Sequence, residues 1–189
     1  MLSFVSEVVT GYHINPNCVR VAVIRYDTNI DAPIRLDSYT EVDSLVQAIG
    51  SLRLHGGGSH LSAALNLLRS HVFASHVVRN NTARIGVIIT DQLQSSSQIT
   101  KAADKVKSEG ITVVAVGITG PGQVNTDFMY TLTTNNWGIP VSDYSQLVPN
   151  ASNIIVHQYG CVAYTTTSAA CPSEWLLAEI FSLVTRKYD

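Results

Sequence analysis

Residues 83–91 read Ala-Arg-Ile-Gly-Val-Ile-Ile-Thr-Asp, and this stretch decides the fold class. It contains the β-branched residues Ile85, Val87, Ile88 and Ile89 and has almost no polar interruption. Such a run is typical of a strand buried on both faces, as in a parallel sheet covered by helices. The strand ends at Asp91, and ligands of open α/β sheets bind beside the carboxyl ends of the strands. Asp91 is therefore the first candidate site residue.

Further predicted strands, alternating with predicted helices, lie on both sides of this stretch in the sequence. Residues 111–118, Ile-Thr-Val-Val-Ala-Val-Gly-Ile, predict a second strand buried on both faces. Further strands are predicted at 19–26, 32–36 and 137–141. Helical spacing of apolar residues predicts helices over 1–14, 41–52, 59–73, 98–109, 126–133 and 144–159. Strands alternating with helices predict a doubly wound, mostly parallel α/β sheet with helices on both faces.

The last part of the chain differs from the rest in composition. Residues 160–174 are rich in Thr, Ser and Ala, and apolar residues then recur at helical spacing from Trp175 to Val184. This spacing predicts an amphipathic helix. We therefore expect one domain over residues 1–160 and a tail or junction with a helix over residues 161–189.

Composition, charge and motifs argue against nucleic-acid binding, a membrane span and enzymatic activity. The chain has 189 residues, of which 46% are hydrophobic and 14% charged, which suits a globular domain. The net charge is −2 and no basic stripe is present, so we expect no nucleic-acid partner. No apolar run approaches the length of about 18 residues that a membrane span needs. There is no Gly-x-Ser-x-Gly, no dinucleotide fingerprint and no acid/base pair around Asp91, so an enzyme is disfavoured.

Taken together, these segments resemble a von Willebrand factor type A (VWA) domain over residues 1 to about 160. The resemblance rests on Leu-Arg-Leu-His-Gly-Gly-Gly-Ser (52–59) opening a helix, Val-Ile-Ile-Thr-Asp (87–91), and Lys-Ser-Glu-Gly-Ile-Thr-Val-Val-Ala-Val-Gly (107–117). The sequence is similar in character to extracellular matrix members of the family, such as matrilins and collagen VI. It implies a non-enzymatic, secreted, extracellular module for protein binding or adhesion, with partners such as matrix proteins or collagen. The resemblance also fits a homo-oligomer or fibre.

The family resemblance also implies a metal-ion-dependent adhesion site for Mg²⁺ or another divalent cation. Ser59 matches the family's Thr after the glycines, and Asp91 matches its Asp after the central strand. Gln92 stands where Gly is usual. As an alternative, Ser59 fits a helix N-cap and Asp91 a turn residue. We therefore expect a partial or degenerate metal site.

One family element is missing from its usual place. The Asp-x-Ser-x-Ser loop and the strand before it would precede the helix at residues 1–14. That strand is central in the family's sheet, and leaving its place empty would expose two apolar edges. We therefore expect either that the sequence is N-terminally incomplete or that another segment fills the gap.

The expected fold suggests a disulfide bond, and the sequence contains two Asn-x-Ser/Thr sequons. It places Cys18 and Cys161 at the end of the domain away from the ligand edge, so a Cys18–Cys161 disulfide is one hypothesis. A Cys161–Cys171 disulfide is its rival. Either would indicate an oxidising compartment. Asn80-Asn81-Thr82 and Asn150-Ala151-Ser152 make Asn80 and Asn150 candidate glycosylation sites.

The alternative function is an intracellular VWA scaffold for complex assembly, which free cysteines and unglycosylated asparagines would favour.

Overall fold

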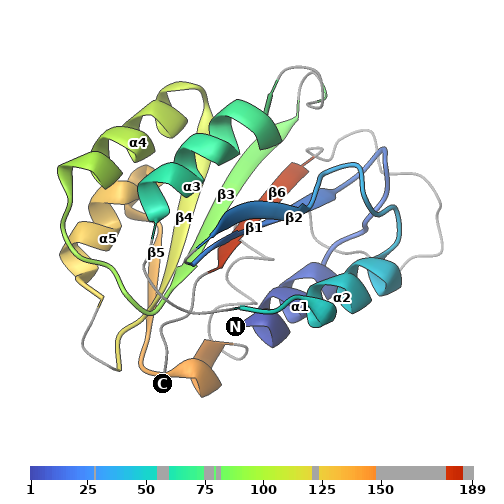
Figure 1. Ribbon diagram of the computed structural model, residues 1–189, viewed down its shortest axis with the longest axis horizontal. Helices are drawn as coiled ribbons and strands as arrows, with labels where there is room; N and C mark the ends of the chain where they lie inside the picture. The colour runs from blue at the N-terminus through green and yellow to red at the C-terminus, as the bar shows by residue number, and fades with distance from the viewer. Residues whose placement is uncertain are drawn as a thin grey trace.

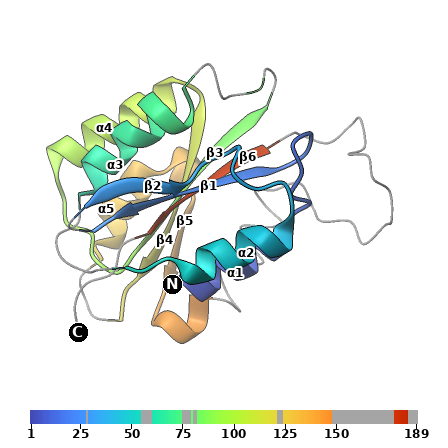
Figure 2. The ribbon, with the colours of Figure 1, turned by 45° about the vertical axis from the view of Figure 1, so that its right-hand side comes forward.

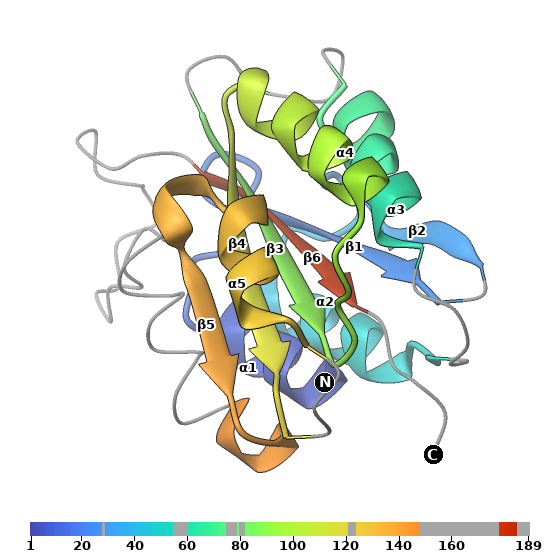
Figure 3. The same ribbon diagram turned by 90° about the vertical axis from the view of Figure 1, so that its left-hand side faces the viewer.

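The computed structural model describes residues 1–27, 29–54, 60–74, 79, 82–120 and 124–147, together with the backbone of residues 178–184. Six strands form one sheet in the order β2-β1-β6-β3-β4-β5. Strand β2 is antiparallel to β1, and all other neighbours are parallel. Figure 3 shows this order across the molecule. The prediction of a mostly parallel α/β sheet is confirmed.

The helices and strands agree closely with the periodicity of the sequence. The strands are β1 (Arg20–Tyr26), β2 (Ile30–Ile34), β3 (Ala83–Thr90), β4 (Ile111–Ile118), β5 (Gly138–Val141) and β6 (Ala178–Val184). The α-helices are α1 (Leu2–Thr10), α2 (Val42–Ser51), α3 (Leu61–Leu67), α4 (Ser97–Ser108) and α5 (Thr126–Leu132). Short helices of other types are η1 (Leu68–Val72), η2 (Thr134–Asn136) and η3 (Tyr144–Gln146).

Helices cover both faces of the sheet. Figures 1 and 2 show α1 and α2 on one face and α3, α4 and α5 on the other. Within β1, Val21 and Val23 belong to the buried cluster under α1 and α2, whereas Ala22 and Ile24 belong to the cluster under α3 and α4. This alternation follows from the two-residue period of a strand. It explains why the strand sequences are apolar at almost every position.

Strand β6 occupies the central position of the sheet, between β1 and β3. It pairs in parallel with β1 from Arg20↔Glu179 to Arg25↔Val184, and with β3 from Ala83↔Ala178 to Ile89↔Val184. The amphipathic helix predicted for this part of the tail is therefore wrong, because residues 178–184 form a strand. Of the two expectations for the missing central strand, the structure shows the second, in which another segment fills the gap. Residues 161–177 lie outside the described part of the chain, so the domain boundary at 160 stays a prediction.

Three predicted helices differ in detail. The helix predicted over 1–14 ends at Thr10. The helix predicted over 59–73 begins at Leu61 and changes to a π-helical turn at Leu68–Val72. The helix predicted over 144–159 starts as a 3-10 turn at Tyr144–Gln146, and residues from 148 lie outside the described part. Gly110 ends α4 with φ +75°, as expected of a glycine after a helix.

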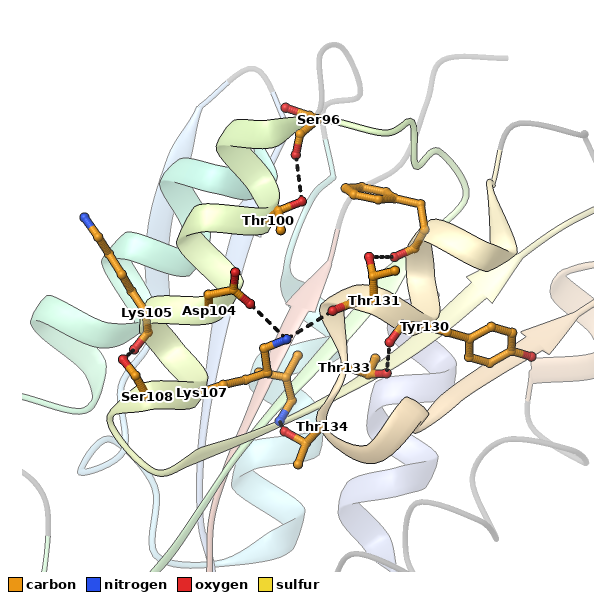
Figure 4. A network of polar contacts seen from close by, with 12 residues as sticks. Ser96, Thr100, Asp104, Lys105, Lys107, Ser108, Tyr130, Thr131, Thr133 and Thr134 are labelled. Carbon is orange, nitrogen blue, oxygen red and sulfur yellow. Dashed lines mark hydrogen bonds and ion pairs between the residues drawn. The ribbon is translucent and has the colours of Figure 1, made fainter.

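Polar contacts fix α5 against α4 and the sheet, as Figure 4 shows. The ammonium group of Lys107 donates to the Thr131 carbonyl at 3.0 Å and lies 3.2 Å from the Asp104 carboxylate. The backbone N–H of Val113 in β4 donates to the Thr134 hydroxyl at 3.0 Å. These contacts hold α5 in place, and the chain continues from η2 into β5.

Candidate functional site

All five parallel strands end at one edge of the sheet, which we call the C-terminal rim (Figure 3). Asp27 follows β1, Asp91 follows β3 and Tyr144 lies just beyond β5. Because the strands are parallel, their ends bring these residues to the same side of the molecule. The rim is therefore the candidate functional site that the position of Asp91 predicted.

Asp91 is held in a largely buried position at this rim. Its residue is 7% exposed, and the phenolic hydroxyl of Tyr144 donates a hydrogen bond to Oδ2 of its carboxylate. The preceding bend is closed by Thr90, whose hydroxyl donates to the Gln92 carbonyl at 2.8 Å and accepts from the Gln92 N–H at 3.2 Å. The Asp91 carboxylate therefore has a fixed direction.

Tyr144 is positioned by the short helix η3. The side chain of Asp143 caps this helix by accepting from the Ser145 N–H at 2.8 Å. Hydrogen bonds from Ser145 hold the pKa of the Asp143 carboxyl below its usual value. Leu147, 1% exposed, anchors the other end of the turn in the core. Sequence reasoning did not single out Tyr144, because its partner is 53 residues away in the chain.

The second predicted metal ligand, Ser59, lies outside the described residues. Its neighbour His60 is described, and the backbone N–H of His60 donates to the Tyr26 carbonyl at the end of β1, at 3.4 Å. The start of α3 therefore lies at the C-terminal rim. His60 is the N-cap of α3, so the alternative interpretation of Ser59 as the N-cap is wrong.

Arg25 fixes the chain that leads toward the glycine-rich loop. Its guanidinium pairs with Asp31 of β2 and donates to the Arg53 carbonyl at 2.7 Å. The hydrogen bond to Asp31 raises the pKa of Arg25 above its usual value. Through Arg25, strand β1 is linked both to the edge strand β2 and to the chain just before residues 55–59.

Tyr26 and Asp27 are the most deeply buried polar residues at the end of β1. The Tyr26 hydroxyl donates to the Ile89 carbonyl at 3.2 Å, across the central position of the sheet. Burial raises the pKa of the Tyr26 phenol well above its ordinary value, and the nearby charge of Asp91 acts in the same direction. Asp27, 1% exposed, accepts from the Asn29 N–H at 3.0 Å.

Among the described residues at the rim, Asp91 is the predicted ligand of a divalent cation. Among them, no group of three or more His, Cys, Asp or Glu residues gathers in a way that could hold a metal ion. Mg²⁺ takes about six oxygen ligands and keeps several waters, so one carboxylate can contribute to its binding without completing it. Asp91 fits as one oxygen ligand. The residues that follow β6 in the sequence are Thr185, Arg186 and Lys187, in place of the acidic Asp-x-Ser-x-Ser loop that the family resemblance implies.

The other predicted modification sites are only partly covered by the description. Cys18 is 4% exposed and is disulfide-bonded. Cys161 and Cys171, and also Asn80 and Asn150, lie outside the described residues. The chain has three cysteines, so a bonded Cys18 means that the rival Cys161–Cys171 pairing is wrong. The Cys18–Cys161 pairing and both glycosylation sites stay predictions. Over the described part of the chain, no helix is long and apolar enough to cross a membrane.

A mostly parallel, helix-covered sheet with a carboxylate at its C-terminal rim defines an α/β domain of the doubly wound class. The model of the von Willebrand factor type A domain family matches residues 1–152, so the chain belongs to this family. It is 30% identical over 118 residues to the human collagen alpha-6(VI) chain, covering 62% of this chain and 5% of the collagen chain. It is 27% identical over 120 residues to human matrilin-3, covering 61% of this chain and 24% of matrilin-3. The chain thus spans a small part of these extracellular matrix relatives.

Solved structures show the same fold. The proximal thread matrix protein 1 from the mussel byssus matches with a TM-score of 0.72 and 20% identity, over 82% of this chain and 40% of that chain. A second structure of that protein, with a zinc-occupied MIDAS motif, matches with a TM-score of 0.70 and 23% identity, over 79% of this chain and 39% of that chain. The manganese-loaded TRAP protein of Plasmodium vivax matches with a TM-score of 0.62 and 17% identity, over 78% and 62% of the two chains. Structural relatives of this chain therefore include metal-loaded VWA proteins.

Proposed function

We propose that this chain is an extracellular, non-enzymatic protein-binding module of the matrix type, and that it recognises matrix proteins through its C-terminal rim. The observation that carries the proposal is the Asp91 carboxylate, held by Tyr144 at the rim of a VWA fold. The collagen and matrilin relatives support a matrix protein, such as a collagen, as the partner.

The rim would hold a divalent cation as a partial site. Asp91 and Ser59 would supply two oxygen ligands, and water would supply most of the others. A bound cation would offer a Lewis-acidic position to an acidic side chain of the partner. Asp91 orients one ligand oxygen, and Tyr144 keeps that carboxylate hydrogen-bonded. With so few protein ligands, we expect binding only at about millimolar metal.

The disulfide at Cys18 supports the extracellular proposal over the intracellular scaffold. Disulfides persist in oxidising compartments and are rare in the cytosol. Cys18 is buried just before β1, where the bond joins the folded core to a later part of the chain. An intracellular scaffold would instead be expected to keep its cysteines reduced.

The binding proposal is tested by surface plasmon resonance of the full chain over immobilised collagen VI. We expect Asp91→Asn to weaken binding at least about tenfold, in line with the loss of one charged contact. Asp104→Asn is the matched control, because Asp104 lies on α4 in an exposed ion pair with Lys107. Equal binding by the Asp91 and Asp104 variants, or no binding to collagen VI by the parent chain, would reject the proposed function.

A further inference from the structure

A pocket of about 340 Å³ lies between the end of the edge strand β2 and the end of the helical segment formed by α3 and η1. This segment begins beside the C-terminal rim, at His60, and runs away from it, because β3 starts at the opposite end of the sheet. At a rise of about 1.5 Å per residue, the pocket lies roughly 15 Å along the helix from His60. It is therefore separate from the Asp91 site. Ligand pockets measure about 300–1,000 Å³, so this one suits one or two side chains of a partner.

The interior of the pocket is apolar and belongs to the core. Leu36 and Val72 are 2% and 7% exposed, and both are members of the buried cluster under α3 and α4. Ala32 and Leu67 are partly buried and pack against the same cluster. Because packed side chains hold these walls, the pocket exists before a ligand binds. A bulky apolar group of a partner would leave water on entering it, which favours binding.

The π-helical turn η1 shapes one wall of the pocket. The backbone N–H of Phe73 donates to the Leu68 carbonyl at 2.9 Å, five residues back in the chain, as in a π-helix. Ser70, His71 and Val72 all line the pocket, although three successive residues span about 200° of a regular α-helix. The wider turn thus brings three neighbouring side chains to one place. Single π-helical turns are frequent at functional sites.

Ser70 orients the ring of His71. The Ser70 hydroxyl donates to the Asn66 carbonyl at 2.8 Å, and its oxygen lies 2.7 Å from Nδ1 of His71. A hydroxyl has a single hydrogen, so Nδ1 of His71 is the donor in the second contact. Within the described part of the chain, the other ring nitrogen, Nε2, forms no hydrogen bond. It is left for a ligand, and in the charged ring it donates a hydrogen bond.

Arg35 supplies a positive charge at the mouth of the pocket. Its side chain is 64% exposed, and its Nε lies 3.5 Å from the Asp37 carboxylate in an ion pair that is exposed on both sides. Exposed ion pairs contribute little to stability, so this contact is readily exchanged for another. A guanidinium fork binds a carboxylate through two parallel hydrogen bonds. Arg35 and His71 together therefore favour a carboxylate over a neutral group.

The edge of β2 does not favour an added strand. Pro33 lies inside β2, and its nitrogen carries no hydrogen. It therefore cannot donate to a neighbouring strand, which is how proline protects the edge of a sheet. A partner is better accommodated with its side chains in the pocket than as an extension of the sheet.

We propose that this pocket binds a segment of a partner protein in which a glutamate or aspartate adjoins a bulky apolar side chain. The apolar side chain fills the pocket between Leu36 and Val72, and the carboxylate binds the Arg35 guanidinium beside Nε2 of His71. Charge complementarity selects an acidic segment, because the described residues that line the pocket include a guanidinium and an imidazole but no carboxylate. This contact surface does not depend on a cation at the rim.

The proposal is tested by titrating the ¹⁵N-labelled full chain with the peptide acetyl-Gly-Phe-Glu-Gly-amide and recording amide chemical shifts. We expect shift changes centred on residues 67–72 and a Kd of about 1 mM, as suits a short ligand. Glutamine in place of the peptide's glutamate, or Arg35→Gln in the protein, should weaken binding about tenfold, because a hydrogen bond between charged groups is lost. Arg53→Gln is the matched control, because Arg53 is exposed and does not line the pocket.

A second variant fills the pocket without removing a polar group. Ala32→Phe should abolish binding of the peptide while the thermal unfolding midpoint stays close to that of the parent chain. Asp91→Asn should bind the peptide as the parent does, so a failure here is distinguishable from a failure of the proposed function at the rim.

Three results would overturn the proposal directly: equal binding of the glutamate and glutamine peptides, equal binding by Arg35→Gln and the parent, or no shift changes at residues 67–72. Tighter binding of 3-phenylpropionate than of the peptide would assign the pocket to a small organic acid. Shift changes at residues 67–72 that follow protein concentration without peptide would assign it to a second copy of the chain. Either result overturns the proposal as well.

Discussion

The Tyr144 hydroxyl, just beyond β5, donates a hydrogen bond to the Asp91 carboxylate, just beyond β3. The two residues lie on either side of the end of β4, so the contact spans the C-terminal rim. Tyr144 is 40% exposed, whereas Asp91 is 7% exposed. We therefore expect the hydroxyl to compete with a cation or a partner for the Oδ2 atom of this carboxylate.

Removing this hydroxyl should strengthen metal binding. We expect Tyr144→Phe to bind Mn²⁺ about tenfold more tightly than the parent chain, because a hydrogen bond to a charged group contributes about 1.5–3 kcal/mol. Isothermal titration calorimetry measures the change. Tyr130→Phe is the matched control, because Tyr130 contacts the region of Gly138 at the opposite end of β5. Unchanged or weaker Mn²⁺ binding in Tyr144→Phe would show that Tyr144 supports the site instead of competing for it.

The buried phenol of Tyr26 should make the free energy of unfolding fall at alkaline pH. Its pKa is raised by burial, so above about pH 10 the unfolded chain loses this proton while the folded chain retains it. Its contribution to the free energy of unfolding is complete below the unfolded pKa and falls as the pH rises beyond it. Tyr26→Phe should show a shallower fall in urea-denaturation midpoint between about pH 10 and 11. Parallel pH profiles of the two proteins would contradict this expectation.

Replacing either of two glycines by alanine should change the free energy of unfolding, in opposite directions at the two positions. Gly110 ends α4 with φ +75°, so Gly110→Ala should lower the free energy of unfolding by about 1 kcal/mol. Gly50 lies inside α2 with nothing within 4 Å of an added Cβ, so Gly50→Ala should raise it by about 0.5–1 kcal/mol. Urea denaturation followed by circular dichroism gives both values. The same sign in both variants would contradict the helix-end assignment at Gly110.

The disulfide at Cys18 should contribute to stability. Reduction is expected to lower the free energy of unfolding by about 2–4 kcal/mol, as is typical for a native disulfide. Mass mapping of a non-reduced digest should find Cys18 linked to Cys161. A Cys18–Cys171 peptide would correct the pairing, and a free Cys18 thiol would contradict the bond itself.

Local sequence signals predicted most of the described elements. The run at residues 111–118 is β4 without a change at either end, because a strand buried on both faces is apolar at nearly every position. Helix α4 ends where Gly110 predicted, because glycine adopts positive φ without strain. Asp91 was predicted at the rim because it follows a buried strand. These features depend on residues that are neighbours in the chain.

The contacts of the site could not be predicted in the same way. Tyr144 meets Asp91 only because β5 and β3 end at the same rim. The π-helical turn at Leu68–Val72 follows the helical spacing of the sequence but has a different hydrogen-bond pattern. Such features depend on how distant segments pack.

The sequence by itself determined that this protein has alternating strands and helices, a sheet buried on both faces and a carboxylate at the end of β3. Its apolar periodicity contains that information locally. Only the tertiary structure decided that residues 178–184 are the central strand. Their apolar spacing is compatible with a helix, but β1 and β3 offer unpaired backbone groups on both sides, and satisfying these favours a strand.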